Sequence, residues 1–355
     1  MPIGRLRLQS FRCFGLEDIV LEGSAILKGP NGSGKTSLLE AIYLLARGRS
    51  FRTSRLSNLV RAGDQSFRVE SSVLFQEESW TVKTTFECGL KTYINDRDST
   101  AREVGRLFPL TLMDSDITQI VLGAPERRRR LLDWLMFHVE PENWRTWKFY
   151  RRALLQWQWA LRSGMSADVW FGRMMELAPG IEESRKRLLA GCLPFWEQAA
   201  SILFHGQTFK FDYKNGRDLP GRDGMDTQSK DLSMDGPTSI FTGPGLQKAD
   251  VEIRVEQNPV RQFFSRGQAK LLAMALVWGG SRFLAQKLDT CPILLLDDFS
   301  SELDEAAQAQ LLGLMEEGGI QVIMTASSLS HVALERWSNG LFHVEQGHVQ
   351  AVRPC

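Results

Sequence analysis

One short segment constrains this chain more than any other, because it matches the pattern G-x-x-x-x-G-K-[ST]. Its residues are Gly29, Pro30, Asn31, Gly32, Ser33, Gly34, Lys35 and Thr36. Glycines let backbone N–H groups converge on an anion, the lysine reaches β- and γ-phosphates, and the final hydroxyl binds Mg²⁺. A short apolar run, 24–27, precedes the segment, and apolar residues at a helical period, 36–46, follow it. This context favours a nucleotide-binding P-loop over a glycine-rich turn with a chance lysine.

A second motif is an apolar strand, 292–296, that ends in Asp297 and Asp298. Ligands in α/β proteins bind at the carboxyl ends of parallel strands. Asp297 is therefore expected to hold Mg²⁺ together with Thr36, and Asp298 to orient or activate water. Lys35, Asp297 and Asp298 form the candidate catalytic set. The alternative, two solvated acids in a surface turn, is disfavoured by the phosphate loop.

A weaker signal is the sequence Phe264-Ser265-Arg266-Gly267-Gln268, which stands just before a candidate buried helix at 269–278. A serine and backbone N–H groups at a helix N-terminus can bind an anion. Ser265, Gly267 and Gln268 are therefore candidate nucleotide-binding residues. Ser265 can equally be a plain helix cap without further function.

The chain has 355 residues, which is enough for two or three domains. Strands are expected at 3–8 (an edge strand), 67–75 and 80–86, before a segment at 122–205 that is rich in Leu, Arg, Glu and Trp. The predicted domains are an N-terminal part of an α/β head (1–121), a helical insertion (122–205) and a C-terminal part of the head (206–355). In the last part, 214–239 is expected to be a mobile loop, 304–315 a helix and 320–325 a strand. The insertion contains seven tryptophans, whose clustering favours packing over base stacking: Trp134, Trp144, Trp147, Trp157, Trp159, Trp170 and Trp196.

The formal net charge is only +1, so any nucleic acid must be held by a local basic patch. The strongest basic run is Arg127, Arg128, Arg129 and Arg130, which either contacts DNA phosphates or forms a solvated helix face. A second group follows the phosphate-loop helix: Arg47, Arg49, Arg52 and Arg55. No apolar run reaches the roughly 20 residues of a membrane span. The five scattered cysteines favour a reducing, cytoplasmic location.

The order of these motifs resembles the ATPase heads of the ABC type, and more closely the RecF family of SMC-like DNA repair ATPases. Seven stretches carry the resemblance: LRLQSFRCF (6–14), GPNGSGKTSLLEAIYLL (29–45), GRSFRT (48–53), RRRLLDWLMFHVEP (128–141), SRGQAKLL (265–272), LLLDDFSSELD (294–304) and QVIMTAS (321–327). It implies an α/β ABC-type head of the P-loop NTPase class with a helical insertion.

The resemblance also implies a function. Two heads would dimerise on ATP, each nucleotide lying between one subunit's P-loop and Ser265 and Gly267 of the other, with Asp304 in a loop at the interface. The implied activity is a weak, DNA-stimulated ATPase of recombinational repair and replication-fork maintenance. It would act on gapped, single-stranded or junction DNA, support recombinase loading and SOS induction, and work with the mediators RecR and RecO, away from membranes.

The sequence departs from the family pattern at three places. Gln247 and Lys248 stand where the family has His and Arg, the acid at Asp298 is shorter than the usual glutamate, and no switch histidine follows the strand at 320–325. Two alternatives stay open: the nucleotide-binding subunit of an ABC transporter, and a clamp that binds ATP and DNA without hydrolysis.

Overall fold

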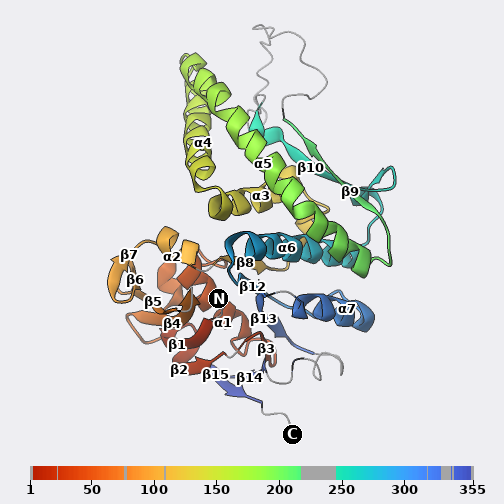
Figure 1. Ribbon diagram of the computed structural model, residues 1–355. Helices are drawn as coiled ribbons and strands as arrows, with labels where there is room; N and C mark the ends of the chain where they lie inside the picture. Colours follow the sequence, from red (N-terminus) through yellow and green to blue (C-terminus); the bar gives the residue numbers. More distant parts are fainter. Residues whose placement is uncertain are drawn as a thin grey trace. The chain divides into compact units, whose positions relative to one another are not determined.

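The structure is a computed structural model that describes residues 3–21, 23–75, 78–107, 109–216, 245–317, 319–328, 337 and 340–352. The chain divides into two compact units (Figure 1). The head unit comprises 1–118, 195–207 and 264–355, and the inserted unit comprises 119–194 and 208–263. Each is described by itself.

The first sheet of the head unit has the order β15-β14-β3-β13-β12-β8. Its strands are β3 (Ala25–Lys28), β8 (Leu110–Met113), β12 (Ile293–Leu296), β13 (Gln321–Ala326), β14 (Leu341–Glu345) and β15 (His348–Ala351). All neighbours pair in parallel except β14 and β15. Every residue of β12 and β13 is buried, which is why β12 is continuously apolar and β13 does not alternate, its two polar residues being the buried Gln321 and Thr325. The apolar strands predicted at 292–296 and 320–325 are thus confirmed.

The second sheet is antiparallel, with the order β2-β1-β4-β5-β6-β7. Its strands are β1 (Ile3–Phe11), β2 (Phe14–Val20), β4 (Phe67–Phe75), β5 (Glu78–Phe86), β6 (Leu90–Ile94) and β7 (Arg97–Ser99). The expectation of an edge strand at 3–8 is wrong, because β1 pairs on both sides. Its alternation has another cause: Leu6 and Leu8 face the core, while Arg5 and Arg7 face solvent beside Asp18.

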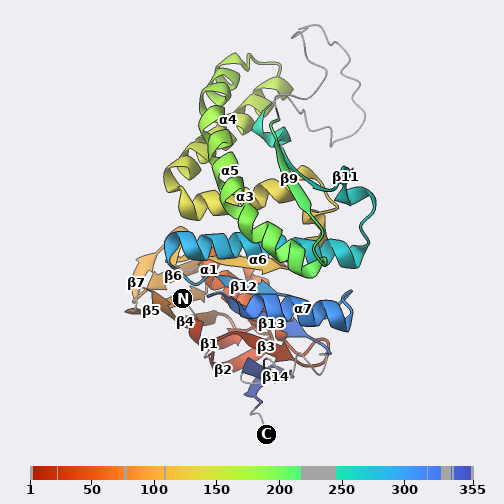
Figure 2. The ribbon, with the colours of Figure 1, turned by 45° about the vertical axis from the view of Figure 1, so that its right-hand side comes forward.

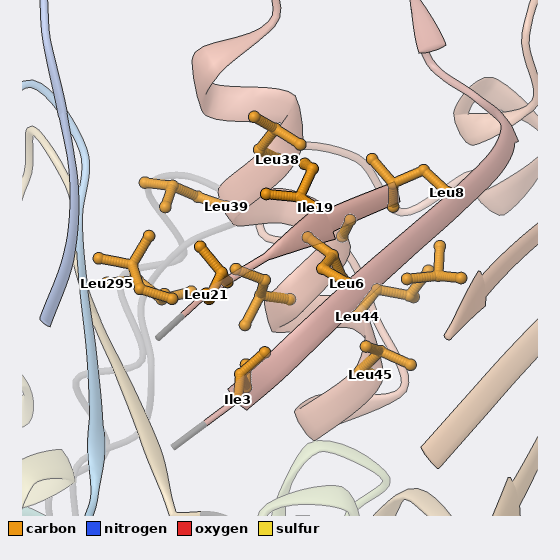
Figure 3. Packing of buried hydrophobic residues seen from close by; sticks show 14 of the residues in the cluster. Ile3, Leu6, Leu8, Ile19, Leu21, Leu38, Leu39, Leu44, Leu45 and Leu295 are labelled. Carbon is orange, nitrogen blue, oxygen red and sulfur yellow. The ribbon is translucent and has the colours of Figure 1, made fainter. Parts of the chain in front are cut away.

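The helices of the head unit are α1 (Lys35–Arg47), α2 (Ala101–Leu107), α6 (Arg266–Leu288) and α7 (Glu305–Glu316), with a 3-10 turn at Leu56–Leu59. Helix α1 packs against strands of both sheets. Its leucines therefore meet apolar side chains of β1, β2 and β12 in one core (Figure 3). This packing fixes the start of α1, and with it the phosphate loop.

The inserted unit contains more than the predicted helices. It holds α3 (Pro125–Val139), α4 (Pro141–Arg162) and most of α5 (Asp168–Leu203), and also a three-stranded antiparallel sheet. The strands are β9 (Phe209–Lys214), β10 (Asp250–Val255) and β11 (Asn258–Pro259), and 3-10 turns occupy Ile117–Ile120, Leu246–Lys248 and Val260–Gln262. Its second segment, 208–263, was assigned to the head from the sequence. It lies instead with the helices, because β10 packs on α3 (Figures 1 and 2).

The tryptophans of this region serve mainly in packing. Trp157 and Trp196 are buried, and Trp144 stacks on Trp147 with ring centroids 5.5 Å apart. Trp159 and Trp170 are exceptions, being 56% and 38% exposed. The loop expected at 214–239 lies outside the described residues beyond 216. Among the residues that are described, no helix has the length and apolar character needed to cross a membrane.

Candidate nucleotide-binding site

The phosphate loop connects β3 to α1, as its sequence predicted. Gly32 and Gly34 have φ angles of 82° and 115°, a backbone region that side chains with a Cβ rarely enter. At Gly29 the restriction is spatial, since a Cβ atom would lie 2.1 Å from the carbonyl oxygen of Val344 in β14. The loop can therefore take this shape only with glycine at these positions, and its N–H groups stand at the N-terminus of α1.

Lys35 is the first residue of α1, and its ammonium group points back into the loop. Nζ donates hydrogen bonds to the carbonyl oxygens of Gly29 (2.7 Å) and Pro30 (2.8 Å). Burial lowers the pKa of Lys35, while the carboxylates of Asp297 and Asp298 act in the opposite direction. The lysine is thus held beside both acids, where its charge can meet phosphate oxygens.

Asp297 follows β12 and joins three segments that are distant in sequence. Its Oδ1 accepts hydrogen bonds from Thr36 Oγ1 (2.9 Å) and from Thr325 Oγ1 (2.8 Å), which lies in β13. A carboxylate and a hydroxyl side by side are the hard oxygen donors that Mg²⁺ takes from a protein when phosphates supply other ligands. The residues present therefore fit a Mg–nucleotide complex, as the sequence predicted for Thr36 and Asp297.

Asp298 has a left-handed backbone conformation, with φ 54°. Its N–H donates to Thr325 Oγ1 (2.8 Å), and its carbonyl oxygen accepts from Lys270 Nζ (3.2 Å) and Ser301 Oγ (3.0 Å). The backbone is thus fixed on both sides, while the carboxylate is exposed and lines the same cleft as Lys35. This arrangement can present a carboxylate to water.

These groups line a cleft of 580 Å³, which is within the usual range for small-molecule sites. The cleft also includes residues without an assigned role in the sequence analysis: Arg12, Asn58, Thr325 and Ser327. Arg52, from the basic group 47–55, lies there too. Thr325 and Ser327 lie at the end of the strand predicted at 320–325, where the sequence contains no switch histidine. The only feature of the sequence that could have marked them as functional is this position at the end of a strand.

Arg12 is held at the cleft by a bidentate ion pair. Its Nε and Nη2 atoms each donate to a carboxylate oxygen of Glu40 at 2.8 Å, and Nη1 donates to the carbonyl oxygen of Asn58 at 2.9 Å. Glu40 is fully buried in α1 and also contacts Ser50 and Arg52. The family-like stretches 6–14 and 48–53 thus meet at one buried carboxylate beside the cleft.

Ser265 caps α6, as its position before the helix predicted. Its hydroxyl accepts from the N–H of Gln268 (3.2 Å), and Gln268 Oε1 accepts from the N–H of Ser265 (3.0 Å). Gly267 lies against the loop after β12, because a Cβ atom there would be 3.0 Å from the carbonyl oxygen of Glu302. Ser265, Gly267 and Gln268 do not line the cleft that contains Lys35.

Lys270, one turn into α6, is almost fully buried and connects this helix to the loop after β12. Nζ donates to the carbonyl oxygen (2.6 Å) and hydroxyl (2.7 Å) of Ser301, in addition to the carbonyl oxygen of Asp298. Burial lowers the pKa of Lys270. Asp304, at the end of this loop, caps α7 through the N–H of Ala307 (2.8 Å).

The arginine run at the start of α3 does not form one basic surface, which corrects the expectation for part of it. Arg128 is buried: Nε and Nη2 donate to Asp250 (2.7 and 3.0 Å), and Nη1 donates to the carbonyl oxygens of Ile120 and Gly123. Arg129 donates to the carbonyl oxygen of Ala249. These two arginines hold the segment 245–250, and the guanidinium of the buried Arg128 is taken up by these contacts. Arg127 is half-buried, and Arg130 is exposed and pairs with Glu126.

Gln247 has a packing role in the same segment. Its Oε1 accepts a hydrogen bond from the hydroxyl of Tyr150 in α4 (2.8 Å), and that hydroxyl also accepts from the N–H of Leu246 (3.1 Å). Buried Arg185 donates to the carbonyl oxygen of Leu246 (3.2 Å) and to Asp133 (2.7 Å). The segment is therefore anchored to all three helices of the inserted unit.

Comparison with known proteins agrees with this geometry. The family model of the RecF/RecN/SMC N-terminal domain matches residues 2–350. The chain is 32% identical to the DNA replication and repair protein RecF of Pseudomonas entomophila over 365 residues, covering 98% of each protein. It is also 32% identical to the protein of the same name from Vibrio parahaemolyticus over 371 residues, covering 99% of this chain and all of the relative.

Solved structures show the same fold. An ATP complex described as the recombination mediator protein RecF of the RecFOR pathway superposes with a TM-score of 0.78 at 22% identity, covering 98% of this chain and 96% of that one. An SMC head bound to the C-terminal winged-helix domain of ScpA gives a TM-score of 0.62 at 18% identity, covering 99% of this chain and 96% of the other. The predicted fold, an ABC-type ATPase head with an insertion, is confirmed.

Proposed function

Because this chain belongs to the RecF/RecN/SMC family and, within it, to the RecF-type DNA replication and repair proteins, we propose that it is an ATP-dependent switch that acts on DNA during recombinational repair. One observation carries the proposal: Thr36, Asp297 and Thr325 bring their side-chain oxygens together beside Lys35 in the cleft. Of these, Thr36 and Asp297 are the two donors that a P-loop protein supplies to a Mg–ATP complex.

Each residue of the cleft has a distinct task. The N–H groups of the loop from Gly29 to Gly34 and the ammonium of Lys35 bind the phosphates. Thr36 and Asp297 hold Mg²⁺. When bound, this ion would neutralise negative charge on the phosphates. Thr325 keeps the carboxylate of Asp297 oriented by its hydrogen bond of 2.8 Å.

Asp298 accepts a hydrogen bond from water beside the terminal phosphate, and its shorter side chain suits slow turnover and a long-lived bound state. Ser265 and Gly267 lie outside their own subunit's cleft, which leaves them free to bind the nucleotide of a second copy. ATP would thus be enclosed between two subunits, and hydrolysis would release them. ATPase activity is expected to be weak and to rise with DNA.

The biological setting follows from the relatives. One solved relative is placed by its description in the RecFOR pathway, so we infer that gapped, single-stranded or junction DNA and the mediators RecR and RecO are the partners of this chain. The role would include recombinase loading, replication-fork maintenance and SOS induction, in the cytoplasm. The relatives described above give no support to the transporter alternative, since they are repair proteins and SMC heads.

The test is an ATPase assay combined with sedimentation, each with and without gapped DNA. The proposal expects slow hydrolysis that gapped DNA accelerates, and a shift from monomer to dimer on addition of ATP and Mg²⁺. Dimerisation without any hydrolysis would establish the non-hydrolysing clamp instead. Hydrolysis that neither DNA nor dimerisation affects would contradict the proposed switch.

A further inference from the structure

Helix α4 presents two opposite faces, and only one of them packs inside the inserted unit. The inner face carries Tyr150, Ala153, Trp157 and Ala160, all buried and spaced three and four residues apart. Trp157 packs against Phe171 of α5, with ring centroids 6.4 Å apart, and α4 and α5 run side by side in Figures 1 and 2.

The opposite face forms an exposed seam with the same spacing: Lys148, Arg152, Leu155, Trp159 and Arg162. At a rise of about 1.5 Å per residue, this α4 seam is about 21 Å long. Leu155 and Trp159 are 57% and 56% exposed, and Phe149 beside the seam is 60% exposed. Large apolar side chains gathered on one exposed face, rather than scattered singly, indicate an interaction site.

The charges of the seam are all positive. Lys148, Arg152 and Arg162 form no ion pair with any residue that the structure describes. The one acid of α4, Glu142, lies a turn and a half before the seam and pairs with Arg145 at 2.9 Å. Two cations one turn apart, a third ten residues further along the helix, and the ring of Trp159 between the last two match the needs of a single strand, whose phosphates bind the cations and whose unstacked base lies on the ring.

We propose that the α4 seam binds single-stranded DNA through Lys148, Arg152 and Arg162, with a base stacked on Trp159. This inference rests on the proposed DNA-binding function and gives it a surface. It also places the contact away from the arginine run of α3, where Arg128 and Arg129 are committed to packing. Duplex DNA would use the cations alone, because its bases are already stacked.

The experiment measures affinity and salt dependence of the full-length protein for an oligonucleotide of about 20 thymidines, for the same oligonucleotide with abasic sites, and for a duplex of equal length. The triple variant Lys148→Gln, Arg152→Gln, Arg162→Gln should bind the single strand at least about ten-fold more weakly, with a salt slope reduced by about 2. Trp159→Ala should weaken binding to the base-containing strand at least about five-fold and leave abasic binding almost unchanged.

The matched control is Lys186→Gln, Arg187→Gln in α5 of the same unit, where both charges are already paired with Glu182 and Glu140. This control should keep the wild-type affinity and slope, and ATP binding should be unchanged in every variant. A triple variant with the wild-type slope overturns the α4 seam while leaving DNA binding intact. If the triple variant binds DNA normally but loses an acidic partner protein, the seam is a protein-docking surface instead. If the wild-type protein binds none of the three DNAs, the proposed function fails as well.

Discussion

The hydroxyl oxygen of Thr36 lies 2.9 Å from a carboxylate oxygen of Asp297, although 261 positions separate the two residues in sequence. The contact joins the start of α1 to the end of β12, and Thr325 completes it from the neighbouring strand β13. Both sequence motifs therefore act at one point, and Thr36 and Asp297 are the residues that would hold a Mg²⁺ ion there.

Asp297→Asn should separate nucleotide binding from metal dependence. The amide keeps the size of the side chain but loses the charge that balances a divalent cation. We expect ATP affinity measured with Mg²⁺ to fall at least about ten-fold, while the weaker affinity measured in EDTA stays near the wild-type value. Equal losses in both conditions would mean that Asp297 only supports the fold.

Lys35→Ala should weaken ATP binding by at least about ten-fold, or ~1.4 kcal/mol, because it removes the charge that faces the β- and γ-phosphates. Titration with a fluorescent ATP analogue measures this. Circular dichroism and the unfolding midpoint serve as the control for folding. A folded variant with unchanged affinity would contradict the phosphate-loop assignment.

Asp298→Asn should bind ATP and form dimers that persist, because the amide cannot accept a proton from the attacking water and hydrolysis is what releases the dimer. Ser265→Arg should do the reverse: its own cleft binds ATP, but the bulky side chain blocks the partner's nucleotide. Light scattering with ATP and Mg²⁺ distinguishes the two.

Two results would reject this two-subunit switch. One is hydrolysis at the wild-type rate by Asp298→Asn, and the other is normal dimerisation of Ser265→Arg. Because Ser265 also caps α6, Ser265→Thr is the matched control: it keeps a hydroxyl cap and should preserve stability.

Substitutions of different arginines in the α3 run should have very different effects on the free energy of unfolding. Arg128→Gln breaks a buried ion pair with Asp250 and leaves an uncompensated carboxylate, so we expect a loss of about 3–5 kcal/mol in the free energy of unfolding. Arg130→Gln removes an exposed pair with Glu126 and should change it by less than about 1 kcal/mol. Urea denaturation measures both, and similar losses in the two variants would contradict the assigned contacts.

The buried Lys270 should make the free energy of unfolding increase as the pH rises through the alkaline range. Burial lowers its pKa in the folded state below the ordinary 10.5, so over that interval the unfolded chain holds a proton that the folded chain has released. Since stability rises with pH wherever the unfolded state binds more protons, the wild type should gain stability relative to Lys270→Met between the lowered pKa and 10.5. Chemical denaturation at several alkaline pH values measures the difference.

The control is Lys287→Met near the end of the same helix, where the lysine is exposed. This variant should follow the wild-type pH dependence. A constant difference between wild type and Lys270→Met at all pH values would show that the burial of Lys270 does not perturb its titration.

The sequence alone predicted those features of the fold and the site that are formed by residues close together in the chain. The phosphate loop, the apolar strand before Asp297 and the helix after Ser265 all follow from residues within a few positions of each other. Residues whose role depends on distant partners were missed. Arg12 gains its place from Glu40, and Thr325 gains its place from Asp297, so neither has a pattern of its own.

The same reason explains the errors. Arg128 has the sequence of an exposed basic run, and its partner Asp250 lies 122 positions away. Strand β1 alternates like an edge strand because one face is solvated, although β4 pairs with it across 55 intervening residues, 12–66. The sequence also does not show that β9 and β10 belong to the inserted unit. The two strands pair with each other, but a long polar segment separates them in the chain.

The contact of Gly29 with Val344 has a consequence for how the protein is made. The loop that receives ATP is among the first segments to leave the ribosome, but the strand on which Gly29 rests, and the N–H of Gly347 that bonds to Ser33, follow more than 300 residues later. Strand β3 likewise waits for β13 and β14 before it has neighbours. During synthesis the nucleotide site is therefore unfinished and its apolar strand unpaired, so the nascent chain cannot use ATP to stabilise itself. Chaperone protection in that interval would matter more for this head than for one that closes in sequence order.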